Sequence, residues 1–180
     1  MKHIFTAILI TVFCSLPLSL LAQQNDFIED YLERLENSRK YLLLVAETMP
    51  EVNYGFKPTQ ESMSFAENLM HIGYAMDWHS QSLLGARKSR DWKTDTLFKT
   101  ANKSKKEMIN LIDKTFDETI KFIKQFDTSK LDDELDYFGL NRSKQQILLL
   151  LADHITHHRA QMLVHMRLNG LVPPRYVLFQ

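Results

Sequence analysis

Cysteine is almost absent from this sequence. Among 180 residues there is one, Cys14, and it lies inside an uncharged apolar run from Ile4 to Leu21. A short basic start, an apolar middle and a small residue at its end are typical of a secretory signal peptide. If this segment is removed, the mature chain has no cysteine, which excludes disulfides, thiolate metal ligands and a cysteine nucleophile.

The predicted signal peptide also sets the domain boundary. We expect cleavage after Ala22, so that residues 1–22 are the signal and residues 23–180 are a single exported domain, periplasmic or extracellular. Leu20 is larger than the residue usually found two positions before a cut, and an uncleaved anchor is therefore an alternative. A lipoprotein attached through Cys14 is a weaker alternative, because bulky residues directly precede this cysteine.

An excess of charge of either sign is missing as well. The chain has 22 Lys and Arg against 22 Asp and Glu. Nucleic-acid-binding proteins usually carry a strong basic patch, so we expect no nucleic-acid partner. Beyond the predicted signal no second apolar run is long enough for a stable membrane span, and there is no internal repeat. The length of the remaining chain suits one domain with a hydrophobic core of its own.

Four stretches have apolar residues at helical spacing. The first extends from Asn25 to about Glu47, before a Met-Pro pair that disfavours further helix. The other three begin at Ser-x-x-Glu or Ser-x-x-Gln capping boxes; they run from Ser64 to about Leu84, from Ser104 to about Phe126, and from Ser143 to Asn169. We expect an all-α fold, an up-down four-helix bundle with long connecting loops, whose last helix is the longest. A minor variant of this fold has a small hairpin within Asp127–Leu140.

Two histidines on the predicted fourth helix, His154 and His158, are four residues apart and therefore share one face. The same face carries Ile147, Leu151, Gln161, His165 and Leu168. Burying two imidazoles is costly unless something pairs with them, and a metal ion is a suitable partner for both rings. The alternative is a pair of ordinary hydrogen-bonded core histidines.

A third ligand has to come from another helix, and the residues alone leave two choices. His71 and His79 are about 12 Å apart along one helix, so only one of them can serve. Periodicity slightly favours His79, which aligns with an apolar stripe. His71 shares its face with small or polar residues that suit a cavity wall: Ser64, Asn68, Ala75 and Ser82. We expect His157 to point about 100° away from His158, and His165 to lie about 10 Å along the axis, too far to join the site.

Several segments together carry a family resemblance. They are Lys57-Pro58, Ser64 to Ile72, Trp78, the run His154-Ile-Thr-His-His158-Arg159-Ala-Gln161, Arg167, Gly170, Pro174 and Tyr176. In these positions the chain resembles the DinB/YfiT-like family of metal-dependent four-helix-bundle proteins. The resemblance covers essentially the whole mature chain, and its most specific part is the His-x-x-His-His-Arg-x-Gln run.

The resemblance implies one divalent ion bound by His71, His154 and His158. Imidazole ligands suit zinc, nickel, copper or iron. Two residues depart from the family pattern. Ala160 stands where glycine is usual, and Asp153 stands where asparagine is common, so that its carboxylate could support a metal ligand from behind.

Three histidine ligands would leave a fourth position open, as in catalytic rather than structural sites. We expect an exported metal-dependent hydrolase or thiol-dependent transferase with an unknown small-molecule substrate. The export signal weighs against a thiol cosubstrate that is concentrated inside the cell. The alternative is a non-catalytic metal-stabilised bundle that binds a small molecule or a protein. The sequence assigns no catalytic residue, and it leaves open whether the protein forms a homodimer.

The side chains expected around the ion are few. Glu67, Asp77 and Asp153 are candidates for orienting or basic groups, although the capping box already accounts for Glu67. Asp77 could instead be a closed fourth ligand, which would make the ion structural. Trp78 is expected in one wall of the cavity.

Overall fold

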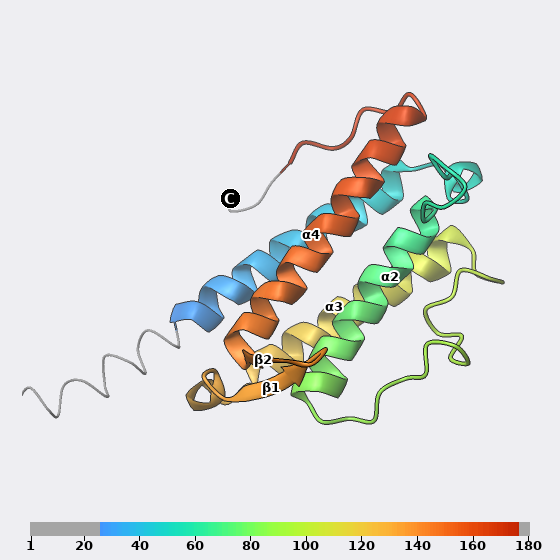
Figure 1. Ribbon diagram of the computed structural model, residues 1–180. Helices are drawn as coiled ribbons and strands as arrows, with labels where there is room; N and C mark the ends of the chain where they lie inside the picture. The colour runs from blue at the N-terminus through green and yellow to red at the C-terminus, as the bar shows by residue number, and fades with distance from the viewer. Residues whose placement is uncertain (1–25, 177–180) are drawn as a thin grey trace, which may run out of the picture.

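The structure is a computed structural model, and it describes residues 26–176. The predicted signal peptide and its cleavage site lie outside these residues. A first helix covers residues 26–48. It is followed by η1 (Glu51–Asn53), α2 (Phe65–Asp77), η2 (Trp78–Leu84), α3 (Lys105–Lys124), η3 (Thr128–Lys130), β1 (Glu134–Tyr137), β2 (Leu140–Ser143) and α4 (Lys144–Leu168). Four long helices lie side by side, with α2 packed against both α3 and α4 (Figure 1). The predicted all-α four-helix bundle is confirmed.

Local signals set the ends of these helices. At the start of α2, α3 and α4 a serine hydroxyl accepts from a backbone N–H three residues on, while that residue's side chain accepts from the serine N–H. These are the three predicted capping boxes. Gly170 has a φ of 73°, and the N–H of Leu171 donates to Met166 O at 3.0 Å. This is the Schellman ending that only a residue tolerant of positive φ adopts easily. With 25 residues, α4 is longer than α2 and α3.

The core forms where α2 meets its neighbours. Gly73 lies in the middle of α2, and a Cβ there would lie 2.5 Å from Ile112 Cδ1 and 2.8 Å from the ring of Phe98. A side chain at this position would therefore push α3 and the preceding loop away from α2. The close approach holds the loop of residues 85–104 along α2, on the side facing away from the first helix (Figure 1).

Three details differ from the expectations. The last part of the second helix is a π-helix, η2. The hairpin is real, but it extends to Ser143 and leads directly into α4 instead of ending at Leu140. Leu168, predicted on the inward face, is exposed at the last position of α4.

The last described residues return along the bundle. Tyr41 on the first helix donates its hydroxyl to Pro174 O at 3.0 Å, and its ring lies edge-on to Tyr176 at 5.4 Å. Of the described helices, none combines the length and the apolar character that a membrane crossing requires.

Candidate metal centre

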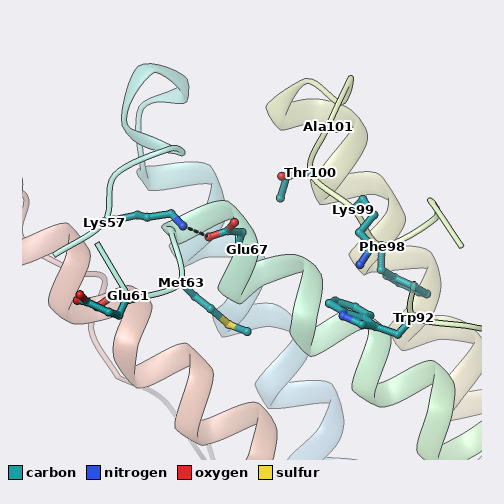
Figure 2. A pocket seen from close by; sticks show the side chains of 10 residues that line it. Lys57, Glu61, Met63, Glu67, Trp92, Phe98, Lys99, Thr100 and Ala101 are labelled. Atoms are coloured by element: carbon teal, nitrogen blue, oxygen red, sulfur yellow. Dashed lines mark ion pairs between the residues drawn. The ribbon is translucent and has the colours of Figure 1, made fainter. Parts of the chain in front are cut away.

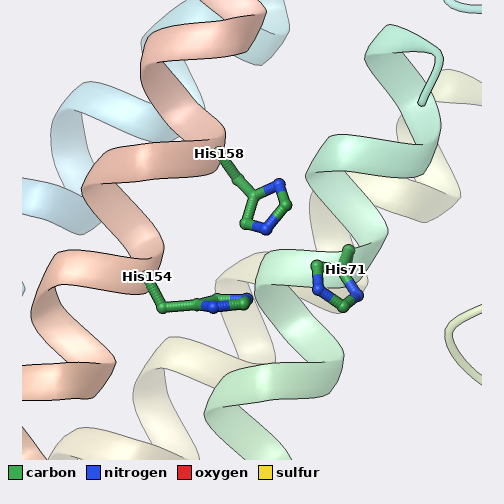
Figure 3. Close-up of side chains that lie close together, drawn as sticks. All are labelled: His71, His154 and His158. Atoms are coloured by element: carbon green, nitrogen blue, oxygen red, sulfur yellow. The ribbon is translucent and has the colours of Figure 1, made fainter. Parts of the chain in front are cut away.

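Three histidine side chains converge between α2 and α4. His71 comes from α2, and His154 and His158 come from successive turns of α4; Figure 3 shows the rings pointing toward one another. The ring centres are 4.5–5.0 Å apart, and one ring nitrogen from each residue lies within 4.8 Å of the others. In a tetrahedral zinc site such nitrogens are about 3.4 Å apart, so small ring rotations would bring them into place.

Two of these rings have a buried nitrogen without a partner among the described residues. His71 Nδ1 and His154 Nε2 are both inaccessible to solvent and accept or donate no hydrogen bond. A buried polar atom without a partner is costly and rare in folded proteins. A cation held between the rings would be bound by one nitrogen of each ring and would satisfy His154 Nε2, so the residues present fit a divalent metal ion.

The third ring is oriented by Asn68. The Nδ2 of Asn68 donates to Ser64 O at 2.9 Å and to Met63 O at 3.3 Å, and these two bonds fix the direction of the amide. Asn68 Oδ1 therefore accepts from His158 Nδ1 at 2.9 Å. With the proton on Nδ1, the lone pair of His158 is on Nε2, the atom left for a metal.

The electrostatic surroundings keep these rings neutral. Burial, strengthened by the neighbouring histidines, lowers the pKa of His154 to about 4 and that of His158 to about 3. Burial also lowers the pKa of His71. Neutral imidazole is the form that ligates metals, so the protonation states at neutral pH suit an ion.

The remaining histidines of these two helices are engaged elsewhere. His79 donates from Nδ1 to Ala75 O at 2.7 Å, and its Nε2 lies 3.0 Å from Tyr137 Oη. His157 is exposed and bonded to a neighbouring glutamine, as its rotation on the helix predicts. His165 is buried, edge-on to Phe56, and remote from the cluster. The structure therefore brings His71 to the pair on α4, whereas the His79 that periodicity slightly favoured contacts Tyr137 of the hairpin.

The three candidate carboxylates also have other partners. Glu67 caps α2 and lies 3.0 Å from Lys57 Nζ. Asp77 is buried and forms ion pairs with Arg87 and Arg90, which lies 3.1 Å away. Asp153 is exposed and lies 3.5 Å from an arginine of the first helix. The alternative in which Asp77 closes the site and the candidate role of Asp153 behind a ligand find no support in this geometry, because both carboxylates pair with arginines and neither joins the cluster.

A cavity of about 410 Å³ adjoins the histidines. Its walls are His71, Tyr74, Ala75, Trp78, His79, Tyr137, Phe138 and His154. The predicted wall residues Trp78 and Ala75 are present. Ser64 and Asn68 are not, because the first caps α2 and the second holds His158.

Comparison with known proteins identifies the family of this chain. The sequence model of the DinB family matches residues 22–179. The chain belongs to the DinB family. YjoA of Bacillus subtilis, an uncharacterized protein, is 23% identical over 154 residues, which are 83% of this chain and 93% of YjoA.

Solved structures of other DinB-like proteins share the fold. A DinB-like protein of Bacillus cereus has a TM-score of 0.64 at 21% identity, covering 84% of this chain and 95% of its own. The structure of YjoA has a TM-score of 0.64 at 20% identity, with coverages of 84% and 96%. A DinB family member of Exiguobacterium sibiricum also gives 0.64, at 16% identity, with coverages of 86% and 98%.

Two residues around the site of this DinB-family chain escaped the sequence reasoning. Asn68 was predicted only as a cavity wall, although its place one turn before His71 on the same face was a usable signal. Trp92 lies in the long loop, where no periodicity applies, yet its ring is edge-on to His71 at 5.9 Å and to Tyr74 at 4.6 Å. Trp92 thus contacts the cluster through the ring of His71.

Trp92 also borders a second cavity, of about 470 Å³ (Figure 2). This cavity differs in character because Lys57, Glu61, Glu67 and Lys99 line it, and Lys99 Nζ lies 3.5 Å from the centre of the Trp92 ring. None of the three clustered histidines lines it. The chemistry of the histidines is therefore directed into the aromatic cavity.

Proposed function

We propose that this protein binds one divalent ion through His71, His154 and His158 and uses it to activate a small molecule in the adjoining cavity. The observation that carries the proposal is the convergence of three neutral imidazoles, two with buried unpartnered nitrogens, at the edge of a cavity. A purely structural site would be closed by a fourth side chain, and no carboxylate of the described chain faces the cluster.

A divalent ion in such a site supplies a Lewis acid that makes water or a thiol nucleophilic at neutral pH. The chain's own contribution begins with orientation, because Asn68 fixes the tautomer of His158. It continues with the aromatic walls, which would displace water from around a bound ligand and so strengthen electrostatic interactions there. This arrangement is compatible with hydrolysis or thiol transfer at the ion.

Proton transfer would fall to a tyrosine–histidine pair. Because His79 Nδ1 donates to a backbone carbonyl, its Nε2 accepts from the hydroxyl of Tyr137. Both residues line the cavity. Burial lowers the pKa of His79 and raises that of Tyr137, so the pair is neutral and can pass a proton between the cavity and the ring.

We further propose that the protein acts outside the cytoplasm. The apolar run before Ala22 supports this, and so does the family match, which begins only at residue 22. An exported location favours water over a cytosolic thiol as the activated nucleophile. Hydrolysis of a small molecule is accordingly the first candidate reaction, and thiol transfer is the second.

A non-catalytic binding role is the alternative function. One observation favours it: the cavity has no carboxylate among its lining residues, whereas many hydrolytic metal sites use one as a general base. The protein would then hold the ion and a ligand without converting it.

Cobalt substitution of the untagged protein distinguishes an ion with an open coordination position from an ion whose ligands all come from the protein. We expect azide at millimolar concentration to change the visible spectrum of the cobalt protein, because an exogenous ligand enters the coordination sphere. The His71→Ala variant should give no such signal. A cobalt spectrum that is insensitive to azide and to 2-mercaptoethanol would contradict the proposed activation and favour the structural role. Hydrolysis screens then decide between conversion and simple binding.

A further inference from the structure

The cavity beside the histidines is lined by aromatic rings and has no charged side chain. Four of its lining residues are Tyr74, Trp78, Tyr137 and Phe138, and the remaining ones are histidines and an alanine. At about 410 Å³ it lies within the size range of small-molecule sites. Burying a charged group here without a partner would be costly. The walls therefore select an uncharged, flat, apolar group.

Phe138 is the unusual member of this set. It is the first residue of the two-residue turn between β1 and β2, with a φ of 55°, followed by Gly139 with a φ of 83°. Such a type I′ turn favours asparagine or glycine at its first position, and a bulky side chain there is rare. Phe138 is also 79% exposed. Neither its backbone conformation nor its exposure is favourable, so folding alone does not explain an aromatic residue here.

The position of the ring supplies the missing reason. Phe138 stacks on Trp78 with ring centres 5.4 Å apart and planes inclined by 30°, and it lies edge-on to Tyr137 at 4.8 Å. The turn thus presents an apolar face beside the mouth of the cavity. Residues that break local preferences tend to be found at functional sites.

We propose that this cavity is a subsite for an uncharged aromatic ring, walled by Tyr74 and Trp78 and covered by Phe138. A donor atom attached to that ring reaches the ion at the three histidines. Among the hairpin residues that line the cavity, Tyr137 carries a side-chain polar atom, Oη, and because its proton is engaged by His79 it can only accept a hydrogen bond from the ligand. The inference rests on the proposed metal function for the donor atom, but the ring subsite is independent of it.

The second cavity differs from the aromatic cavity in the kind of ligand that its lining residues would bind. It carries two lysines and two glutamates, which would partner charged groups, and it does not border the cluster. A charged group that is not itself bound to the ion would thus find its partners in that cavity and not in the aromatic one. An aromatic ring finds its contacts beside the ion.

The test compares 4-phenylimidazole with imidazole as ligands of the cobalt-substituted protein. Both offer the same donor nitrogen, so the difference in their dissociation constants reports the phenyl ring alone. We expect 4-phenylimidazole to bind about tenfold more tightly or better, because the ring is buried against aromatic side chains. Equal affinities in the wild-type protein would overturn the proposal.

Substitution of Phe138 makes the test specific to the hairpin. Phe138→Asn places the residue preferred by the turn, so the thermal midpoint should stay equal or rise, while the phenyl advantage falls several-fold. Phe138→Tyr retains the ring and should keep the advantage. If Phe138→Asn keeps the full advantage, the ring does not reach the hairpin and the proposal is wrong.

Failure of the metal function is recognised separately. If cobalt does not bind, the subsite is tested in the metal-free protein by titrating toluene and following the indole N–H signal of Trp78 by NMR. A saturable shift that weakens in Phe138→Asn would support the ring subsite without the ion. The absence of any shift at saturation with toluene would overturn it.

Discussion

Asn68 Oδ1 on α2 accepts a hydrogen bond from His158 Nδ1 on α4 at a distance of 2.9 Å, and both side chains are buried. This bond links the two helices that carry the candidate ligands. It also decides which nitrogen of His158 carries the proton, because the amide nitrogen of Asn68 is already committed to two carbonyls. The geometry of the ion site therefore depends on a residue that would not touch the ion.

Replacing Asn68 should weaken metal binding more than it weakens the fold. We expect Asn68→Ala to lower zinc affinity by about 10–100-fold, because the ring of His158 loses its orientation. Asn68→Asp keeps the acceptor for His158 but loses the two donor bonds. It should therefore be less stable than wild type and yet bind zinc better than Asn68→Ala. Competition titrations with a zinc chelator and thermal unfolding measure the two properties. Zinc affinities that follow stability alone in both variants would contradict the orienting role.

Local patterns predicted the helices, whereas the third ligand required tertiary structure. Each capping box lies within four residues. The local sequence therefore predicts a helix start at Ser64, Ser104 and Ser143 without reference to the rest of the chain. The spacing of His154 and His158 is equally local. Which histidine of α2 or η2 joins them depends on how these helices are rotated against α4, and the structure brings His71 to the pair, not the His79 that periodicity slightly favoured. The family resemblance supplied His71.

The hairpin and the loop show where the sequence signal is weak. Strands β1 and β2 have four residues each, too few for a clear alternation, and the turn residues Phe138-Gly139 lack the Asn-Gly signature. The partners of Asp77 are ten and thirteen residues away in an irregular loop. No pattern in the sequence pairs them, so Asp77 looked available for the ion when it was not.

Asp77 should matter for stability and not for the ion. Asp77→Asn removes one charge of a buried carboxylate that pairs with Arg87 and Arg90. Because both arginines are partly exposed, we expect a loss of about 1–2 kcal/mol in the free energy of unfolding. Asp153→Asn, at an exposed ion pair, should cost less than about 0.5 kcal/mol. Urea unfolding measures both. Loss of bound zinc in a folded Asp77→Asn variant would show instead that this carboxylate is a ligand.

Acid should destabilise the metal-free protein through its neutral histidines. Burial holds the pKa of His154 near 4 and that of His158 near 3, below the ordinary value of 6.5. The unfolded chain therefore binds more protons than the folded one within this window, and stability falls as the pH falls from 6.5 toward 4. Urea unfolding in a chelator between pH 7.5 and pH 4.5 should show this slope. The slope should be shallower in a variant with both His154→Gln and His158→Gln. An unchanged slope in the double variant would contradict the assignment.

Export should leave a defined amino terminus. We expect the protein isolated from outside the cytoplasm to begin at Gln23, in part cyclised, because Ala22 suits the position before the cut. Intact-mass measurement of the extracytoplasmic fraction gives this terminus directly. Full-length protein beginning at Met1 in the cytosol would refute the prediction.

The most direct test of the metal centre is the metal content of untagged His71→Ala and His79→Ala, measured beside the wild-type protein by inductively coupled plasma mass spectrometry after loading with zinc and removal of excess ion. The two residues lie on the same polypeptide segment, eight positions apart, and both line the same cavity. If His71, His154 and His158 hold the ion, wild type and His79→Ala should retain about one zinc per chain and His71→Ala should retain little. Loss of zinc in His79→Ala with retention in His71→Ala, or an absence of stoichiometric zinc in the wild-type protein, would contradict the account.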